Sequence, residues 1–353
     1  MDNATLVLFL SILISTSLPL LSQYKFEKIG GYSINKSDDF YLSGHLSLAM
    51  DDNRNLYYCF LNQVLKFDSN GRFIKQINPI GRGPGEFETL IDCEVNDEFL
   101  VVQTFSQFKL IFYKKDDLSY SHEIKTKSYN SRQCAIHNGA VITLNDDTKN
   151  NTDLAAVSEY SFDGENSALH GIMPPYAYLS RTSSGGGISS NTDDIFYYSF
   201  TAYPQIWKVN TDSQKSTVYK NSYINFSKLD EGKINGLANN HGSWREYLYS
   251  HSRSTGLYFL NNEKLLIQII DNGNPYKNGA YDESLISRTI DIWDTKLDSV
   301  VGTGIKLPEN KRIVFVNKNL VYLLSEFNYE DKFEKAEFGV DFPFLEIYEL
   351  RKD

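Results

Sequence analysis

Short β-rich segments recur along this chain in groups of four, and this repetition constrains the fold more than any other feature of the sequence. The clearest group runs from Leu42 to Ile77, where apolar runs end at turn clusters such as Asp51–Asn55 and Asp68–Gly71. The dipeptide Asn70-Gly71 readily supplies the positive φ angles that a tight hairpin needs. Four strands joined by tight turns form one up-and-down antiparallel sheet.

Five further units follow, at a spacing of ~40 to 50 residues that is typical of propeller blades. They span, in order, Leu90–Lys125, Gln133–Leu169, Gly187–Tyr219, Gly256–Leu307 and Arg312–Leu350. The last unit is one strand short, whereas Tyr24–Tyr32 forms a strand that belongs to no unit. If this strand completes the last blade, the ring closes and no sheet edge stays open. The sequence therefore predicts an all-β fold, a six-bladed β-propeller of four-stranded antiparallel blades closed by the N-terminal strand.

We expect this propeller to be a single domain over residues 23–353, preceded by a signal peptide at residues 1–22. The apolar run Leu6–Leu18 is too short for a comfortable membrane span, and Ser22 suits a cleavage site. Asp2 and the lack of Lys or Arg before the run leave an uncleaved N-terminal anchor open. We therefore expect a secreted or periplasmic cell-envelope protein that associates with a membrane only through this segment.

The charge of the chain argues against nucleic acid as a partner. Asp and Glu number 45 against 35 Lys and Arg, which gives a net charge of −10, and the basic residues form no stripe. Such a surface repels a phosphate backbone.

The cysteines predict neither a metal site nor a cofactor. Cys59, Cys93 and Cys134 have no metal-ligand spacing, and buried thiols on strands are the favoured interpretation. A single disulfide between two of them stays open in an oxidising compartment. We expect no metal and no cofactor.

The segment Ile80–Phe87, IGRGPGEF, links the first unit to the second and follows Asp68–Phe73, DSNGRF. Together they resemble the GxGPGEF signature of NHL/TolB-like six-bladed β-propeller proteins, many of them secreted or envelope proteins of Bacteroidetes-type bacteria. The resemblance covers one blade and its exit loop, and it implies a fold and a location more than an activity. The glycines permit unusual backbone angles, Pro84 stiffens the loop, and Phe87 can fill the space between two blades. A phosphate-binding loop is excluded because no Lys-Ser/Thr follows.

A long connection, 221–254, separates the fourth unit from the fifth and is the strongest candidate for a binding site. Its end mixes basic and aromatic residues that suit the recognition of a protein, an anion or a sugar. The candidate ligand-binding residues in it are His241, Trp244, Arg245, Tyr247, His251 and Arg253. In the alternative interpretation, Trp244, Tyr247 and Leu248 simply pack on the propeller face.

Three more residues are candidates for ligand contacts. Arg82 and Glu86 flank the glycine loop, where they form an ion pair that fixes it or point into the central channel. His45 falls on a predicted innermost strand, whose polar side chains line the channel.

No catalytic set is evident, since the six His show no HExxH spacing and no Ser lies in a GxSxG turn. We therefore expect a non-catalytic binding propeller whose partner is a protein or a glycan. The alternative is a carbohydrate-active propeller enzyme, a lyase or hydrolase that uses His, Arg or Tyr in the channel.

Overall fold

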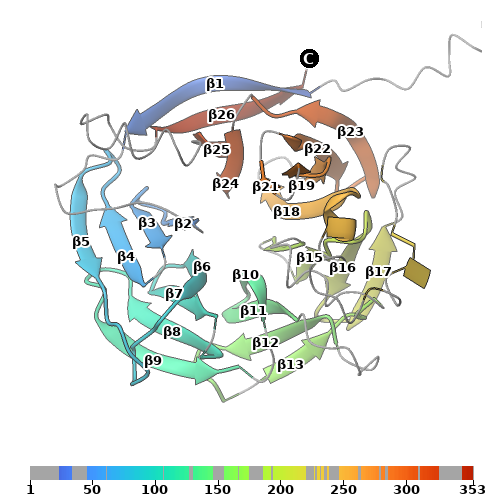
Figure 1. Cartoon of the computed structure of the whole chain (residues 1–353). Coiled ribbons are helices and arrows are strands. Elements are labelled where there is room, and N and C mark those ends of the chain that lie inside the picture. Colours follow the sequence, from blue (N-terminus) through green and yellow to red (C-terminus); the bar gives the residue numbers. More distant parts are fainter. Residues whose placement is uncertain are drawn as a thin grey trace, which may run out of the picture.

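The structure is a computed structural model. It describes residues 24–33, 46–60, 62–105, 107–126, 130–145, 155–165, 167–174, 186–191, 194–219, 226, 229–230, 232–233, 237, 246–260, 264–277, 280–282, 285–308, 311–325 and 344–352. Six four-stranded antiparallel sheets stand in a ring around a central axis, as Figure 1 shows. The predicted six-bladed propeller is confirmed.

Each of blades 1 to 5 is a meander whose four strands follow one another along the chain from the axis outward, and blade 6 takes its outermost strand from the N-terminus. Blade 1 contains β2 (Leu46–Met50), β3 (Leu56–Phe60), β4 (Gln63–Phe67) and β5 (Phe73–Ile77). Blade 2 contains β6 (Leu90–Val95), β7 (Phe99–Thr104), β8 (Lys109–Lys114) and β9 (Tyr120–Lys125). Blade 3 contains β10 (Asn130–His137), β11 (Ala140–Asn145), β12 (Val157–Ser161) and β13 (Ser167–His170). Blade 4 contains β14 (Gly187–Ser190), β15 (Ile195–Ser199), β16 (Ile206–Asn210) and β17 (Lys215–Tyr219). Blade 5 contains β18 (Arg253–Leu260), β19 (Leu265–Asn272), β22 (Ser287–Asp294) and β23 (Ser299–Lys306). Blade 6 contains β24 (Lys311–Asn317), β25 (Leu320–Ser325), β26 (Phe344–Lys352) and β1 (Tyr24–Ser33).

The N-terminal strand closes the ring as the sequence predicts. β1 pairs antiparallel with β26, from Tyr24 opposite Lys352 to Ser33 opposite Phe344, with a bulge between Lys28 and Gly30. The last blade therefore takes its outer strand from one end of the chain and its other strands from the opposite end. This pairing covers a sheet edge that would otherwise expose unpaired backbone groups.

The hydrophobic core lies between neighbouring blades. Each of six buried clusters joins strands of two adjacent blades, because each face of a blade packs against a different neighbouring blade. Phe87 belongs to the cluster between blades 1 and 2, where it is fully buried and meets the Tyr113 ring edge to face at 6.5 Å. The expectation that Phe87 fills the space between blades is confirmed.

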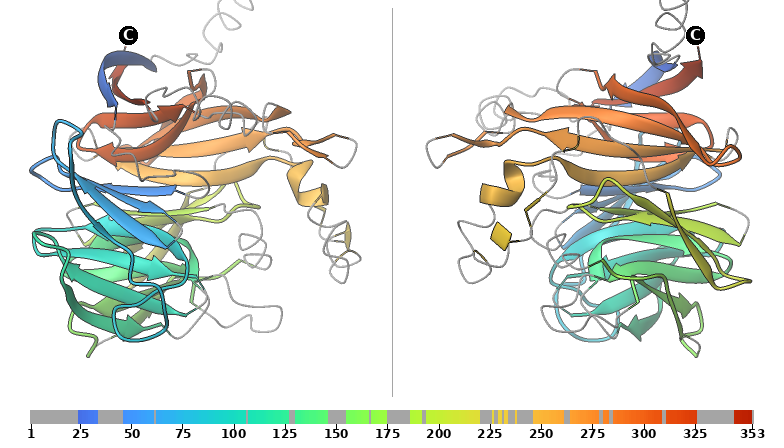
Figure 2. Two further views of the ribbon diagram at one scale, coloured as in Figure 1. Left: turned by 60° about the vertical axis from the view of Figure 1, so that its left-hand side comes forward. Right: turned by 90° about the vertical axis from the view of Figure 1, so that its right-hand side faces the viewer.

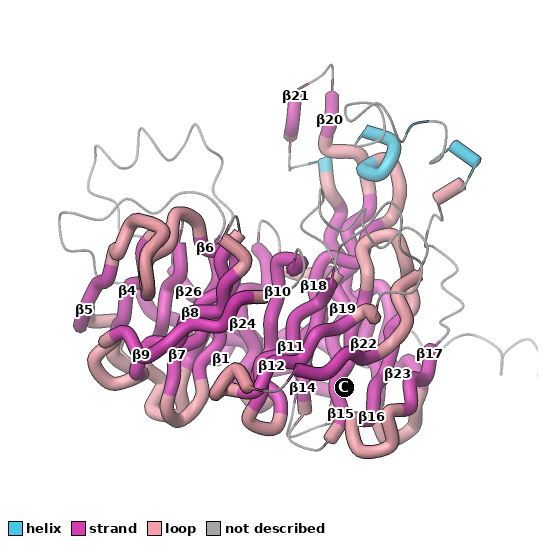
Figure 3. The backbone as a smooth tube through the Cα atoms, turned by 90° about the horizontal axis from the view of Figure 1, so that it is seen from below, coloured by secondary structure: helices cyan, strands magenta, loops and turns pink. Residues whose placement is uncertain are grey.

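One face of the ring carries additional structure beside blade 5. A short hairpin, β20 (Tyr276–Lys277) and β21 (Ala280–Tyr281), projects from this face together with a helical turn at 246–249 (Figures 2 and 3). The turn belongs to the long connection that the sequence singled out, and it leads directly into β18. We call this side of the molecule the decorated face.

A buried carboxylate holds the closing blade together. Glu346 on β26 accepts hydrogen bonds from Lys28 on β1 at 2.7 Å, from Lys311 on β24 at 2.6 Å and from the Tyr348 hydroxyl at 2.6 Å. Burial opposes ionisation of this carboxyl, but the three donors outweigh it and lower the pKa of Glu346 to about 2. The ionised carboxylate therefore links β26 to both β1 and β24 and stabilises the pairing that closes the ring.

Replacement of this carboxylate by an amide tests its contribution. Because the pKa of Glu346 is depressed in the folded protein, the stabilisation is present above its ordinary pKa of 4.5 and is lost as the pH falls toward 2. We expect Glu346→Gln to lose roughly 2 kcal/mol of unfolding free energy near neutral pH, and much less in acid. Chemical denaturation across this pH range measures the difference.

Glu27→Gln is the matched control, because Glu27 is half exposed and pairs with Arg351 on the same strand pair. It should change the unfolding free energy by less than about 0.5 kcal/mol. A difference between wild type and Glu346→Gln that stayed constant from neutral to acid pH would contradict the assignment.

Candidate functional site

A cavity of about 840 Å³ lies on the axis of the ring. All six blades contribute their inner strand to its wall, and each strand offers at least one polar side chain. One such residue from each blade, in order, is Ser47, Glu94, Gln133, Ser189, Thr255 and Arg312. Pockets of this size hold small molecules and short polymers. We call this cavity the central channel.

Asp92 connects three blades on one wall of the channel. The Ser47 hydroxyl of blade 1 and the Cys134 backbone N–H of blade 3, at 2.7 Å, both donate to the Asp92 carboxylate of blade 2. The Cys93 N–H donates to Ser47 Oγ at 3.2 Å and extends the same network. Burial raises the pKa of Asp92 to about 6, although these hydrogen bonds favour the ionised form. Asp92 is thus a structural link whose oxygens are occupied.

Glu94 lies two residues farther along β6 and points to the same side of the strand. It lines the channel, and among the described residues it makes no ion pair. Desolvation raises its pKa well above the ordinary value of 4.5, and repulsion from Asp92 acts in the same direction. Glu94 is therefore a desolvated carboxyl that lacks a positive partner in the described protein.

Arg312 brings a positive charge to the channel from blade 6. Its Nε is buried and has no hydrogen-bond partner within the described part of the chain, where the residue also makes no ion pair. Arg288, another channel residue, is paired instead: its Nε and Nη2 donate to Asp271 at 2.7 and 3.1 Å. Arg288 thus has a carboxylate partner in the protein, whereas Arg312 has none among the described residues.

Tyr258 lies where these charges act together. Burial raises the pKa of its phenol, and the negative charges of Asp92 and Glu94 raise it further, whereas Arg312 and Arg288 act in the opposite direction. The hydroxyl is within 3.4 Å of the Ile313 carbonyl. Tyr258 consequently stays protonated, and its hydroxyl donates to the Ile313 carbonyl.

Arg253 fixes the mouth of the channel on the decorated face. It is the first residue of β18 and is 1% exposed. Its Nη1 donates to the carbonyls of Tyr249 at 2.7 Å, His251 at 3.1 Å and Gly273 at 3.3 Å, and the guanidinium lies 4.6 Å from the Tyr249 ring centroid. Tyr249 in turn meets the Tyr276 ring at 5.5 Å. A predicted ligand residue thus lines the channel and also anchors an aromatic rim.

Two other candidates of the long connection pack on the protein itself. The Asp230 N–H donates to the Tyr247 hydroxyl at 2.8 Å, and the Tyr247 and His251 rings lie 4.5 Å apart. Tyr247 and the buried Leu248 belong to a small apolar cluster with Ala202. For Tyr247 and Leu248 the packing alternative is correct. His45, His241, Trp244 and Arg245 lie outside the described residues.

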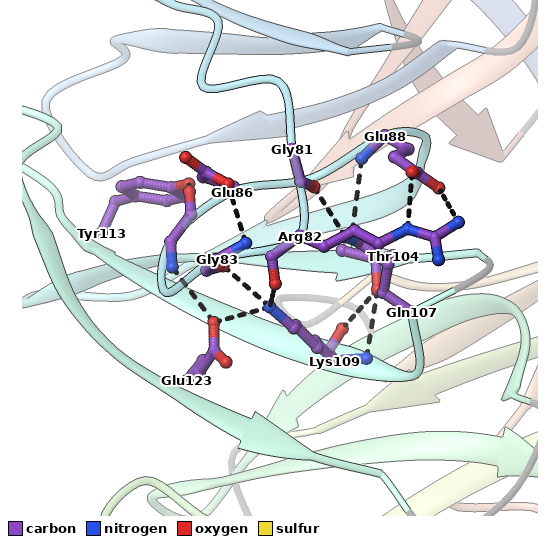
Figure 4. A network of polar contacts seen from close by, with 11 residues as sticks. Gly81, Arg82, Gly83, Glu86, Glu88, Thr104, Gln107, Lys109, Tyr113 and Glu123 are labelled. Carbon is purple, nitrogen blue, oxygen red and sulfur yellow. Dashed lines mark hydrogen bonds and ion pairs between the residues drawn. The ribbon is translucent and has the colours of Figure 1, made fainter.

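The glycine loop does not reach the channel, and the predicted pair Arg82–Glu86 is wrong. Arg82 is exposed and pairs with Glu88 at 2.7 Å, while Glu86 accepts the Gly83 N–H at 2.7 Å inside the loop (Figure 4). The sequence does not distinguish Glu86 from Glu88 as the partner of Arg82, because an arginine side chain can reach both. In the structure the turn at Gly83 directs Glu86 into the loop, and Arg82 pairs with Glu88.

A buried lysine holds the glycine loop in place from below. Lys109 Nζ donates to the Arg82 carbonyl at 3.2 Å, the Gly83 carbonyl at 2.9 Å and Glu123 at 3.1 Å (Figure 4). Gly85 adopts φ +69°, and a Cβ there would lie 2.5 Å from Tyr120. The motif therefore serves the junction between blades 1 and 2.

Among the polar residues of the channel wall, the sequence predicts only Arg253. Asp92, Glu94 and Arg312 lie on the first strand of their units, and the first two alternate with apolar neighbours. This alternation is the available signal, since the innermost strand of each blade presents every second side chain to the axis.

The three cysteines are buried and unbridged. Burial raises the pKa of the Cys59 and Cys134 thiols, which makes them unreactive. Among the described residues, no group of three or more His, Cys, Asp or Glu is arranged to hold a metal ion. In the same part of the chain, none of the helices has the length and hydropathy to cross a membrane.

The sequence profile of the family DUF5128, described as a 6-bladed beta-propeller, matches residues 44–287, which is more than half of the chain. The chain belongs to this family. The match covers blades 1 to 4 and the first two strands of blade 5, including Asp92, Glu94 and Arg253 of the channel wall.

Solved structures from Bacteroides have the same fold. A protein of Bacteroides fragilis that is inferred to be exported shares 14% identity, with a TM-score of 0.64 over 95% of this chain and 98% of the other. A member of the DUF4221 family from Bacteroides vulgatus shares 11% identity, with a TM-score of 0.65 over 94% and 99%. No curated protein matches the sequence. At these identities the likeness extends to the fold alone.

The raised pKa of Glu94 leads to a stability prediction. Its folded-state pKa is raised, so the protein bears no penalty below the ordinary value of 4.5 and a growing penalty as the pH rises above it. We expect Glu94→Gln to stabilise the ligand-free protein by roughly 1–2 kcal/mol near neutral pH and to be neutral near pH 4. Thermal denaturation at the two pH values measures this.

Glu98→Gln, which removes the same charge from an exposed turn, should be neutral at both pH values. Destabilisation of the protein by Glu94→Gln at neutral pH would show that Glu94 has a protein partner.

Proposed function

We propose that this protein is a non-catalytic binding propeller of the cell envelope or extracellular space and that its central channel holds the ligand. The observation that carries the proposal is a cavity lined by all six blades in which Glu94 and Arg312 have no ion-pair partner among the described residues. Removing a charge from water without a partner is unfavourable. A ligand supplies the partners that this arrangement lacks.

The partner is a glycan or a segment of another protein, entering from the decorated face. Tyr249 and Tyr276 stand together at that end of the channel. Aromatic side chains of this kind give recognition surfaces apolar area with little loss of side-chain entropy. His241, Trp244 and Arg245 of the long connection remain predicted contacts for the same partner.

The proposed location draws on two observations. The N-terminal run Leu6–Leu18 has the composition of a signal peptide. The similar structure from Bacteroides fragilis belongs to a protein inferred to be exported.

An enzyme of the carbohydrate-active type is the second candidate, because acidic and arginine side chains of the channel act electrostatically on Tyr258. A catalytic base at this position would need a lowered pKa, whereas burial raises that of Tyr258. None of the described histidines lines the channel. These features favour a hydrogen-bonding wall over a proton-transfer site.

Filling the channel tests the proposal. Thr255 lines the cavity from β18 and is half buried, so Thr255→Trp places an indole in the space of the ligand. Wild type and variant are screened on arrays of glycans and of short peptides. We expect Thr255→Trp to abolish the binding that wild type shows, with at least a tenfold loss of affinity.

Thr217→Trp on the exposed face of β17 is the matched control and should bind as wild type does. A ligand that Thr255→Trp binds unchanged would move the binding site away from the channel. Turnover of an array glycan by wild type would favour the enzyme.

A further inference from the structure

The described channel wall holds an acidic and a basic side chain that do not pair with each other. Glu94 belongs to blade 2 and Arg312 to blade 6, and blade 1 stands between these blades in the ring. No ion pair connects them, and neither has another ion-pair partner within the described residues. A single ligand that reaches both walls can satisfy both charges.

Other ionic groups of the channel are already occupied. The Asp92 carboxylate accepts from Ser47 and Cys134, and Arg288 forms a two-point pair with Asp271. Arg253 donates to three backbone carbonyls. Glu94 and Arg312 differ from these groups, because neither has an ion-pair partner among the described residues.

The neutral polar groups of the wall are largely committed to the protein. Ser189 Oγ accepts the Phe259 N–H at 3.0 Å, and Gln133 Oε1 accepts the Ile188 N–H at 3.2 Å. Ser190 Oγ lies 2.6 Å from His137 Nδ1 and donates to the Asn191 carbonyl. A neutral sugar depends on hydroxyl and amide groups of this kind for its orientation, and few of them are available in this channel.

Apolar residues of the inner strands, including Leu48, Val95, Ile136 and Val316, border the wall but pack into the clusters between blades. The channel thus offers one acidic and one basic side chain that have no ion-pair partner among the described residues, which is the pattern that the two termini of a small peptide complement.

We propose that the central channel recognises a short peptide with free termini, whose ammonium group pairs with Glu94 and whose carboxylate pairs with Arg312. This inference rests on the channel as the binding site and adds the chemical class of the ligand. Charge-assisted hydrogen bonds of both kinds become strong in a buried site, because water no longer competes for them. Arg312 also has the planar donor geometry that fits a carboxylate.

Trialanine and its blocked forms test the two ends of the ligand separately. Calorimetric titration near neutral pH compares trialanine with N-acetyl-trialanine and with trialanine amide. We expect each blocking group to weaken binding about tenfold or more, because each removes one charge-assisted contact. Free alanine carries both charges on one carbon and cannot span two blades, so it should bind more weakly than trialanine.

Two channel variants assign the ends. Glu94→Gln should bind trialanine and its N-acetyl form equally weakly while it still discriminates against the amide. Arg312→Gln should lose the discrimination against the amide and keep the preference for a free amine. The exposed replacements Glu98→Gln and Arg72→Gln should retain both preferences. Circular dichroism melts establish that all four variants are folded.

The outcomes separate this inference from the proposed function. Equal affinity for free and blocked trialanine, or no binding of any of these peptides, overturns the peptide assignment. A neutral oligosaccharide that binds wild type, is lost in Thr255→Trp and is indifferent to Glu94→Gln and Arg312→Gln overturns it too, but leaves the channel as the binding site. A ligand that binds Thr255→Trp unchanged overturns both.

Discussion

The antiparallel pairing of β1 with β26 closes the propeller, and the geometry of the whole ring relies on it. Without it the last blade would have three strands and an open edge, and the ring would lack the pairing that joins its ends. Glu346 reinforces the pairing from inside the blade, where it holds donors from β1 and β24 at once. The central channel follows from closure, because only a closed ring brings six inner strands around one axis.

Closure also explains why the channel is an unusual electrostatic environment. Polar side chains on the inner strands are only partly exposed to water, so a charge there that lacks a partner is disfavoured. The protein neutralises most of these charges itself, as in the pairing of Arg288 with Asp271. Glu94 and Arg312 have no ion-pair partner among the described residues, so they are the most informative residues in the channel for function.

The fold could be predicted from the sequence because its signals are local. Dipeptides such as Asn70-Gly71 mark hairpins, the repeat length sets the blades, and the unmatched strand at Tyr24 indicates how the ring closes. These features depend on neighbours within one blade. The strand bounds consequently agree closely with the expected units. The site is harder to predict because its contacts join residues from different blades. Glu94 has an ordinary sequence context, and only the closed ring shows that it is desolvated and lacks a partner among the described residues.

A crystal structure of the protein grown with trialanine would show whether Glu94 and Arg312 bind the two ends of one peptide in the channel. We predict peptide density on the axis, with the ammonium group within hydrogen-bonding distance of the Glu94 carboxylate and the terminal carboxylate at the Arg312 guanidinium. A peptide bound outside the channel, or Glu94 and Arg312 both engaged by protein side chains, would contradict this assignment.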